Sequence, residues 1–333
     1  MSMREVDIRP QRFDDLRMAA RAQDIDWLQT RRSVFVNSDC PACGGAADRK
    51  AYEKLGFRWD HCGACATAFM NPRPPPDVLA NFYAQSELYR VWNDVIFPAT
   101  RDLRRKQIFQ PRVDRLLELC SRHGIDGGCL IEVGAAHGIF CEEVAHTGRF
   151  TRIIAVEPSA VQAETCRSLG FETIEAPVEG VRNFDRMAEV VAAFEVVEHL
   201  SDPAGAVQAM GRLLKPGGLL LLSTPNVDGF EVATLGAVSD TIYPEHVTLF
   251  SPTGMQRLVE GAGLSMVELS TPGKLDADIV RRKALAGAID LSGQPFLHRI
   301  LIECWNSLGG AFQSFLEESG LSSHMWCVAR RTA

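Results

Sequence analysis

The sequence reads LIEVGAAHGIF over residues 130–140. The first four residues are apolar except for Glu132, which is typical of a strand buried in a parallel sheet. The glycines and alanines that follow are small enough for a ligand to approach the backbone closely. A helix that begins in such a loop presents N–H groups toward the crevice at the strand end. We therefore predict a strand, a ligand-binding loop and the start of a helix over these residues.

An acidic residue follows this loop at the distance expected for a nucleoside site. The apolar strand predicted at 153–156 ends in Glu157, nineteen residues after Gly138. A carboxylate at the end of the second strand is placed to accept hydrogen bonds from ribose hydroxyls. The spacing from Gly134 to Gly138 is GxxxG, and it differs from the GxGxxG of nicotinamide-binding domains. We expect a nucleoside other than a nicotinamide cofactor to bind beside this loop.

The chain on either side of the loop alternates between short apolar strands and amphipathic helices. This pattern indicates a parallel sheet with helices on both faces. The predicted fold class is α/β, a doubly wound, Rossmann-like sheet of seven strands. The strands are expected at 129–133, 153–156, 172–174, 190–194, 219–223, 266–269 and 325–329, and helices at 140–146, 160–169, 204–214 and 297–316.

Four of the ten cysteines form two tight pairs ahead of this region: Cys40 with Cys43, and Cys62 with Cys65. Two CxxC pairs separated by 18 residues are typical of a tetrahedral zinc site, because each turn presents two thiolates. Four thiolates fill the coordination shell, so we expect a structural zinc ion in a small ribbon domain. The alternatives are chance spacing, a redox dithiol, and competition from His61 as a metal ligand. The other six cysteines are interpreted as small buried side chains.

The composition is that of a folded, acidic chain. It has 333 residues, 46% hydrophobic and 23% charged, which excludes a disordered protein. The net charge is −7, and residues 1–76 carry 12 Lys and Arg against 10 Asp and Glu, so no basic stripe suited to nucleic acid is present. No apolar run approaches the ~20 residues of a membrane span, and the charged N-terminus differs from a secretory signal. We expect a cytoplasmic protein without a membrane partner and with nucleic acid disfavoured.

Six motifs follow one another along the chain, at 132–138, 156–158, 194–200, 213–218, 245–252 and 258–264. This ordered set resembles that of class I S-adenosylmethionine-dependent methyltransferases. Its last two members resemble the region that closes the substrate pocket in this family. The resemblance covers residues ~77–333, and the N-terminal ribbon makes the chain similar to a bacterial subgroup associated with sugars, surface glycans and secondary metabolites.

The resemblance implies which residues hold S-adenosylmethionine. Glu132 would lie near the methionine amino group, the backbone of the loop along the methionine portion, and Glu157 on the ribose. Ala136 departs from the family pattern, which has glycine there, so one extra methyl group faces the cofactor. The residues expected to bind the cofactor are Glu132, Gly134, Ala136, Gly138, Glu157, Pro158, Pro177, Val178, Glu195, Val196 and Tyr89.

Two histidines are candidates for the chemistry. A sulfonium is already activated, so the enzyme must mainly align the acceptor and exclude water. A hydroxyl or carbon acceptor also needs a base, and histidine is suited to that near neutral pH. His246, next to Glu245, is the first candidate, with a structural role at a helix start around 251–253 as the alternative. His199 is interpreted as an orienting residue or a base. The run Arg-Arg-Lys at 281–283 faces either a phosphate on the acceptor or solvent at a helix end.

These observations predict a helical arm at 1–36, a zinc ribbon with a Pro-rich linker at 37–76, a helical lid or linker at 77–125 and a methyltransferase domain at 126–333. The predicted function is methyl transfer to oxygen or carbon of a small molecule, a sugar or nucleotide-activated sugar. The alternative is an RNA methyltransferase whose zinc ribbon binds nucleic acid. The negative net charge of the chain disfavours this alternative. A third hypothesis, motivated only by Ala136, is a scaffold that binds the cofactor without catalysis.

Overall fold

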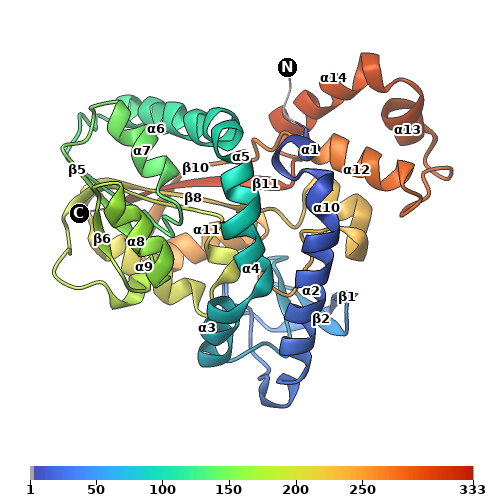
Figure 1. Ribbon diagram of the computed structural model, residues 1–333, viewed down its shortest axis with the longest axis horizontal. Helices are drawn as coiled ribbons and strands as arrows, with labels where there is room; N and C mark the ends of the chain where they lie inside the picture. The colour runs from blue at the N-terminus through green and yellow to red at the C-terminus, as the bar shows by residue number, and fades with distance from the viewer. Residues whose placement is uncertain (1–3, 333) are drawn as a thin grey trace. The chain divides into compact units, whose positions relative to one another are not determined.

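The structure, a computed structural model, describes residues 4–332 (Figure 1). Contacts within the chain divide it into two compact units, and each unit collects segments that are far apart in sequence. We call them the sheet unit and the ribbon unit. The sheet unit consists of Trp92–Ser223, Gln256–Glu268 and Cys327–Ala333, and the ribbon unit of Met1–Val91, Thr224–Met255 and Leu269–Trp326.

A seven-stranded sheet forms the framework of the sheet unit. Its strands are β4 (Cys129–Val133), β5 (Arg152–Val156), β6 (Glu172–Ile174), β7 (Ala188–Phe194), β8 (Leu214–Pro225), β10 (Leu264–Ser270) and β11 (His324–Arg331). Their order is β10-β11-β8-β7-β4-β5-β6, and β4 pairs in parallel with both β5 and β7. The chain winds outward from β4 to β6 and then returns to the other side of β4. The winding therefore reverses between β4 and β7, which is where doubly wound sheets bind their ligands.

Helices cover the two faces of this sheet. Strand β4 is buried along its whole length, as a central parallel strand must be. Since crossovers between parallel strands are right-handed, the strand order puts α7 (Ile139–His146) and α8 (Ala160–Ser168) on one face and α9 (Pro203–Leu213) on the other. Helix α6 (Gln110–Arg122) packs against α7 (Figure 1). The unit also contains α5 (Phe97–Arg104), most of α11 (Pro252–Gly261), π-helical turns at Trp92–Ile96 and Arg105–Phe109, and 3-10 turns at Val178–Gly180 and Val197–His199.

The ribbon unit has a small antiparallel sheet of its own. It consists of β1 (Ala47–Lys54), β2 (Phe57–Cys62), β3 (Ala68–Met70) and β9 (Thr248–Leu249), in that order. The last strand comes from a part of the sequence far from the other three, and it pairs with β3 through Ala68 opposite Leu249. The cysteine-bearing ribbon is therefore fixed to the chain that follows His246.

Helices surround this small sheet within the ribbon unit. Asp24 of α2 (Asp14–Gln29) caps α4 (Glu87–Val91), accepting hydrogen bonds from the Ser86 hydroxyl at 2.6 Å and the Glu87 N–H at 2.8 Å. Within residues 4–332, no helix is long and apolar enough to cross a membrane. The other helices are α1 (Glu5–Ile8), α3 (Pro76–Gln85), α10 (Phe230–Leu235), α12 (Asp276–Leu285), α13 (Pro295–His298) and α14 (Trp305–Glu318), with 3-10 turns at Gln11–Phe13, Arg32–Val34 and Gly236–Val238 and a π-helical turn at Arg299–Glu303.

Candidate functional site

The loop after β4 has a backbone that two glycines make possible. Gly134 and Gly138 have φ angles of +73° and +66°, in the left-handed region that glycine tolerates best. A Cβ on Gly134 would lie 2.6 Å from Cγ2 of Val196. The structure therefore brings Gly134 and Val196, both predicted to bind the cofactor, into direct packing contact, and any larger residue at 134 would displace Val196.

Ala136 lies in the same loop and is also left-handed, with φ of +47°. Its N–H donates a hydrogen bond of 2.9 Å to Oε2 of Glu157. An alanine in this region carries strain of about 1–2 kcal/mol that glycine avoids. Ala136 therefore adopts the backbone conformation that glycine would have at this position, and this conformation is strained for alanine.

Replacing Ala136 by glycine is expected to raise the free energy of unfolding by about 1 kcal/mol, because relief of the strained φ outweighs the extra entropy of the unfolded chain. The matched control is Ala135→Gly. Ala135 is buried and has no positive φ, so its replacement is expected to lower stability by about 0.5–1 kcal/mol. Urea denaturation of both variants measures the difference. Equal losses in the two variants would refute the strain at Ala136.

Glu157 lies directly after β5, next to the loop, and its side chain is buried. Its Oε1 accepts a hydrogen bond from the N–H of Ser159 and its Oε2 from the N–H of Ala136, each at 2.9 Å. Burial raises the pKa of Glu157, and these two donors partly oppose the rise. A carboxylate has about four lone-pair sites, so Glu157 can accept further bonds from a vicinal diol.

Glu132, near the end of β4, is a second buried carboxyl group beside the loop, with 4% of the residue exposed. It accepts a hydrogen bond of 3.0 Å from the thiol of Cys141. Burial raises its pKa to about 8. An ammonium group placed beside it would stabilise the ionised form of the carboxyl group and so lower its pKa. Glu132 is therefore suited to bind a cationic amine.

Glu195 directly follows β7 and has φ of +58°. Its Oε1 accepts a hydrogen bond of 2.5 Å from the Ser223 hydroxyl and lies 3.7 Å from Nη2 of Arg112. The Arg112 guanidinium also stacks over the ring of Phe194, 4.6 Å from its centroid. Burial lowers the pKa of Arg112. Arg112 could not be predicted from the sequence, because an arginine in an amphipathic helix has the pattern of a solvent-facing residue.

His137 connects the loop to the segment that precedes α5. Its ring packs against Phe97 with centroids 4.8 Å apart, and its Nε2 lies 3.2 Å from Oδ1 of Asn93. Gln162 of α8 donates to the same oxygen at 3.0 Å. Because that amide oxygen only accepts, His137 donates from Nε2. Three segments of the sheet unit are thereby held together at the loop.

The remaining residues predicted to bind the cofactor are more scattered. Pro158 and Pro177 are exposed after β5 and β6, whereas Val178 is buried at the start of a 3-10 turn. Tyr89 belongs to α4 of the ribbon unit, where its ring lies 5.3 Å from that of Tyr83. The roles of all these residues in cofactor binding stay predictions.

The three predicted catalytic residues are divided between the units. His199 ends the 3-10 turn after β7 in the sheet unit, and its N–H donates to the Val196 carbonyl at 3.0 Å. Glu245 and His246 belong to the ribbon unit. The Tyr83 hydroxyl donates to the carbonyl of Glu245 at 2.7 Å. The catalytic roles of these three residues stay predictions.

His246 is held by contacts on both its side chain and its backbone. Its Nδ1 lies 2.7 Å from the carbonyl oxygen of Thr241, and since a carbonyl only accepts, Nδ1 carries the hydrogen. The neutral ring then has its basic lone pair on Nε2. The indole N–H of Trp59, in β2, donates to the His246 carbonyl at 3.0 Å. Helix α11 is capped by Ser251, whose hydroxyl accepts from the Gly254 N–H at 2.8 Å, so its start does not depend on His246.

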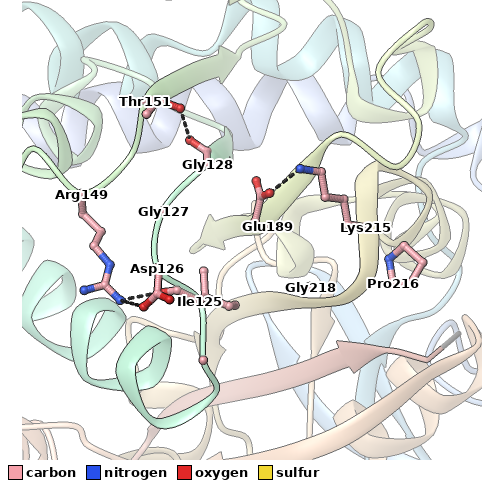
Figure 2. Close-up of a pocket in the computed structure, with 11 residues that line it drawn as sticks. Ile125, Asp126, Gly127, Gly128, Arg149, Thr151, Glu189, Lys215, Pro216 and Gly218 are labelled. Atoms are coloured by element: carbon pink, nitrogen blue, oxygen red, sulfur yellow. Dashed lines mark hydrogen bonds and ion pairs between the residues drawn. The ribbon is translucent and has the colours of Figure 1, made fainter.

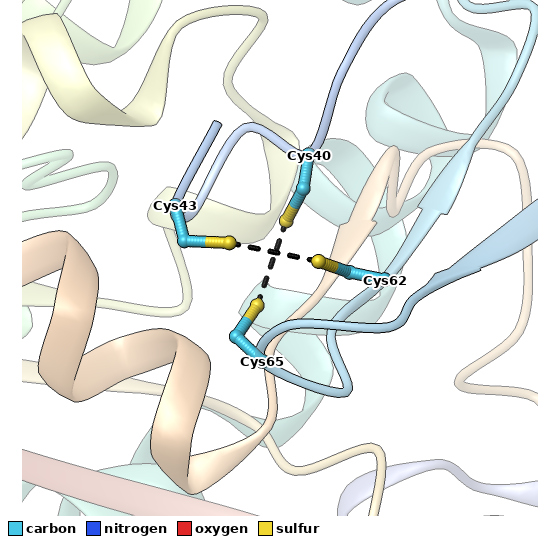
Figure 3. A group of neighbouring side chains, drawn as sticks. All are labelled: Cys40, Cys43, Cys62 and Cys65. Carbon is cyan, nitrogen blue, oxygen red and sulfur yellow. Dashed lines mark hydrogen bonds between the residues drawn. The ribbon is translucent and has the colours of Figure 1, made fainter. Parts of the chain in front are cut away.

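The four paired cysteines converge on one point in the ribbon unit (Figure 3). Their sulfur atoms all lie within 4.8 Å of one another, with Cys40 to Cys65 at 3.6 Å and Cys43 to Cys62 at 3.5 Å. Zn–S bonds of ~2.3 Å in a tetrahedron separate the sulfurs by ~3.8 Å. The four thiols therefore fit a tetrahedral zinc ion with no position left for a substrate.

The two CxxC turns have the same backbone design. The residues directly after them, Gly44 and Ala66, have φ angles of +70° and +63°. The N–H of Gly44 bonds to the carbonyl of Cys40 at 2.8 Å, and that of Ala66 to the carbonyl of Cys62 at 2.9 Å. This repetition aims both pairs of thiols at the same point, as a shared metal requires.

A cavity of about 570 Å³ lies beside the amino-terminal ends of the central strands of the large sheet (Figure 2). Its residues precede β4 and β5 or lie near the starts of β7 and β8, whereas the loop follows β4. Its charged groups already have partners, because Glu189 pairs with Lys215 and Arg149 lies 3.6 Å from Asp126. This cavity is distinct from the predicted cofactor site, and we assign it no role.

Comparisons with known proteins agree with this geometry. Residues 102–269, half of the chain, match the profile of the family described as "Methyltransferase domain". Ubiquinone biosynthesis O-methyltransferases of Cupriavidus pinatubonensis and Colwellia psychrerythraea are 28% and 31% identical over 159 and 164 residues. These matches cover 44% and 45% of the chain and 64% and 66% of the relatives, so the chain spans less than two thirds of their length.

Among solved structures, an S-adenosylmethionine-dependent methyltransferase from Clostridium acetobutylicum has a TM-score of 0.46 and 8% identity, and the match covers 74% of this chain and 98% of that one. The sheet order reverses between β4 and β7, as in doubly wound nucleotide-binding folds. The match to the methyltransferase family over half of the sequence agrees with this fold. The chain belongs to the class I S-adenosylmethionine-dependent methyltransferases.

Proposed function

We propose that this chain transfers a methyl group from S-adenosylmethionine to oxygen or carbon of a small molecule, a sugar or nucleotide-activated sugar. The observation that carries the proposal is the pair of buried carboxyl groups, Glu132 and Glu157, at the ends of neighbouring strands on either side of a loop with positive φ angles. When bound there, S-adenosylmethionine supplies a methyl group already activated on a sulfonium. The residues must then bind it, align the acceptor and exclude water.

The side chains around the loop have complementary roles in this proposal. Glu132 binds the amino group of the methionine portion, and its raised pKa means that it gives up a proton when that cation arrives. Glu157 accepts hydrogen bonds from the ribose hydroxyls while its other lone pairs hold the loop. Glu195 and Val196 flank the methionine portion, and Pro158, Pro177 and Val178 lie toward the adenine.

The negative charge of the protein favours a small acceptor over nucleic acid. The net charge of −7 opposes binding to a phosphate backbone, which disfavours the RNA methyltransferase alternative. The curated relatives are named as O-methyltransferases of ubiquinone biosynthesis, which supports an oxygen acceptor. The ribbon holds a structural zinc in this proposal, and a cytoplasmic location stays a prediction from the sequence.

Transfer of a deuterated methyl group tests the proposed function. The protein is incubated with methyl-deuterated S-adenosylmethionine and three separate acceptor pools: nucleotide sugars, phenolic hydroxyl compounds and total RNA. Mass spectrometry then identifies the labelled pool. Label in nucleotide sugars supports the proposal in full, and label in phenols supports it as far as a small acceptor. Label in RNA alone, or cofactor binding without transfer, contradicts it.

Replacing His246 by asparagine is expected to lower kcat by ~10²-fold or more, as is usual when a general base is removed. The asparagine amide can still donate to the Thr241 carbonyl, so the loop should keep its shape. The Kd for S-adenosylhomocysteine, measured by calorimetry, is expected to stay unchanged. His298, a partly exposed histidine 3.2 Å from Glu303, provides the matched control, and His298→Asn should leave kcat unchanged. Unchanged kcat in His246→Asn would remove it as the base.

A further inference from the structure

Basic side chains of the ribbon unit converge on one carboxylate, Asp240. Nη1 of Arg21 lies 3.2 Å from its Oδ1, and Nζ of Lys283 lies 3.1 Å from its Oδ2. Nζ of Lys54 donates to the neighbouring carbonyl of Ser239 at 2.6 Å. Helix α2, helix α12, strand β1 and the turn after Gly236–Val238 all contribute. We call Arg17, Arg21, Lys54 and Lys283 the basic cluster.

The basic cluster has more positive charge than its carboxylates balance. Asp240 is shared by two cations, and Arg17 pairs with the more exposed Asp14 at 2.8 Å. Within residues 4–332, Lys54 forms no ion pair. In the same described part, the Nε–H groups of Arg17 and Arg21 are buried without an acceptor. Buried donors of this kind are costly until an acceptor reaches them.

The pKa values of the central groups reflect this crowding of cations. Burial, together with repulsion from Arg21 and Lys283, lowers the pKa of Lys54 to about 8, although Asp240 and Glu231 act in the opposite direction. Burial alone would raise the pKa of Asp240, but Arg21 and Lys283 hold it below its usual range. The cations therefore compete for one carboxylate.

The centre of the basic cluster is accessible to a ligand. The side chains of Arg21, Asp240 and Lys283 are 23%, 25% and 26% exposed. The guanidinium groups of two arginines and the ammonium groups of two lysines can donate several charge-assisted hydrogen bonds to the oxygens of one phosphoryl group. The cluster is compact and does not form the extended stripe that a nucleic-acid backbone needs.

We propose that the basic cluster binds a phosphoryl group of the methyl acceptor, such as the diphosphate of a nucleotide-activated sugar. The inference rests on the proposed function for the identity of the acceptor, and it adds the group by which this chain recognises it. The incoming oxygens would accept from the Nε–H groups of Arg17 and Arg21 and from the ammonium of Lys54. An added anion favours the charged form of Lys54, so binding at pH 8 should take up protons.

Calorimetry on the full chain with inorganic pyrophosphate, UDP and uridine tests this site. Pyrophosphate and UDP are expected to bind, and uridine is not. Lys54→Met and Lys283→Met should each weaken UDP binding by ~10-fold or more, as expected for the loss of a charge-assisted hydrogen bond. The matched control is Lys50→Met, on the same strand but paired with Glu53 at 3.0 Å, which should leave the affinity unchanged. Thermal unfolding verifies that each variant is folded.

The variant Asp240→Asn separates a ligand site from an ion-pair network that serves only the fold. It removes the carboxylate that competes with an incoming anion, so UDP affinity should rise. The inference is overturned if no phosphorylated compound binds, if Lys54→Met and Lys50→Met behave alike, or if a short RNA binds more tightly than UDP. S-adenosylhomocysteine binding and deuterium transfer are measured on the same samples. Transfer to an acceptor without phosphate would overturn this inference alone, whereas absence of cofactor binding would refute the proposed function alone.

Discussion

Replacing Cys40 by serine is expected to lower the affinity for zinc by more than ~100-fold and to destabilise the ribbon unit. Loss of a residue that only supports a metal ligand already costs ~10–100-fold in metal affinity, and Cys40 is itself a predicted ligand. Binding energy at a structural zinc is folding energy for a segment with a small core of its own. We expect metal analysis of the purified protein to give one zinc per chain in the wild type and none in Cys40→Ser.

Loss of zinc is also expected to disturb the position of His246. The Ser251 hydroxyl donates to the carbonyl of Cys65, Ala68 of β3 pairs with Leu249 of β9, and Trp59 donates to the carbonyl of His246. Methyl transfer is therefore expected to fall in Cys40→Ser while S-adenosylhomocysteine still binds, because the predicted cofactor residues other than Tyr89 lie in the sheet unit.

A second cysteine of the ribbon unit provides the control for this prediction. Cys304 lies outside the cysteine cluster and is partly exposed. Cys304→Ser should therefore keep the zinc, the thermal stability and the activity of the wild type. A wild-type protein that is folded without metal, or a Cys40→Ser variant that retains full zinc and stability, would contradict the structural assignment.

The central strands could be predicted from the sequence because burial on both faces leaves a continuous apolar run. Strand β4 occupies the predicted residues 129–133, and β7 begins two residues before the predicted 190–194. Strand β8 starts at Leu214, five residues before the prediction. The register explains the difference, because Leu214 pairs with Ala188 and Leu219 with Val190, so that a Lys-Pro-Gly-Gly segment bulges out between two paired residues. Periodicity alone does not reveal such a bulge.

The helix predicted at 297–316 is interrupted for a similar local reason. Cys304 has φ of −115° and ψ of 25°, between a π-helical turn and the start of α14. The apolar spacing continues across this break, because the residues on both sides pack against one core that includes Leu301 and Trp305. A pattern that reports which residues face the core cannot show where the backbone changes its helical geometry.

The site was predictable where one local motif defines it and not where distant segments meet. The loop from Gly134 to Gly138 and the following Glu157 could be identified by spacing. Arg17 and Arg21 share a face of α2 by their spacing of four residues, but only the tertiary fold brings Lys54 and Lys283 beside them. Long-range convergence of charges leaves no signal in a single sequence.

Glu157→Ala is expected to weaken S-adenosylmethionine binding by ~10-fold or more. The substitution removes the charge-assisted hydrogen bonds to the ribose that we propose, which are each worth about 1.5–3 kcal/mol. It also removes the acceptor for the Ala136 N–H, so the strained loop loses its anchor to β5. The two causes act on the same ligand, and Glu157→Gln separates them, because glutamine keeps one acceptor for the loop but loses the charge.

We expect calorimetry with S-adenosylhomocysteine to rank affinity as wild type, then Glu157→Gln, then Glu157→Ala. Glu164→Ala is the matched control, since Glu164 is an exposed glutamate on the next helix, α8, paired with Arg167 at 3.2 Å. Its affinity should equal that of the wild type. If Glu157→Ala binds as tightly as this control, the carboxylate does not contact the ribose, and the buried position of Glu157 would have to be explained by the loop alone. If the glutamine and alanine variants are equally weak, the negative charge, and not the anchoring of Ala136, decides the affinity.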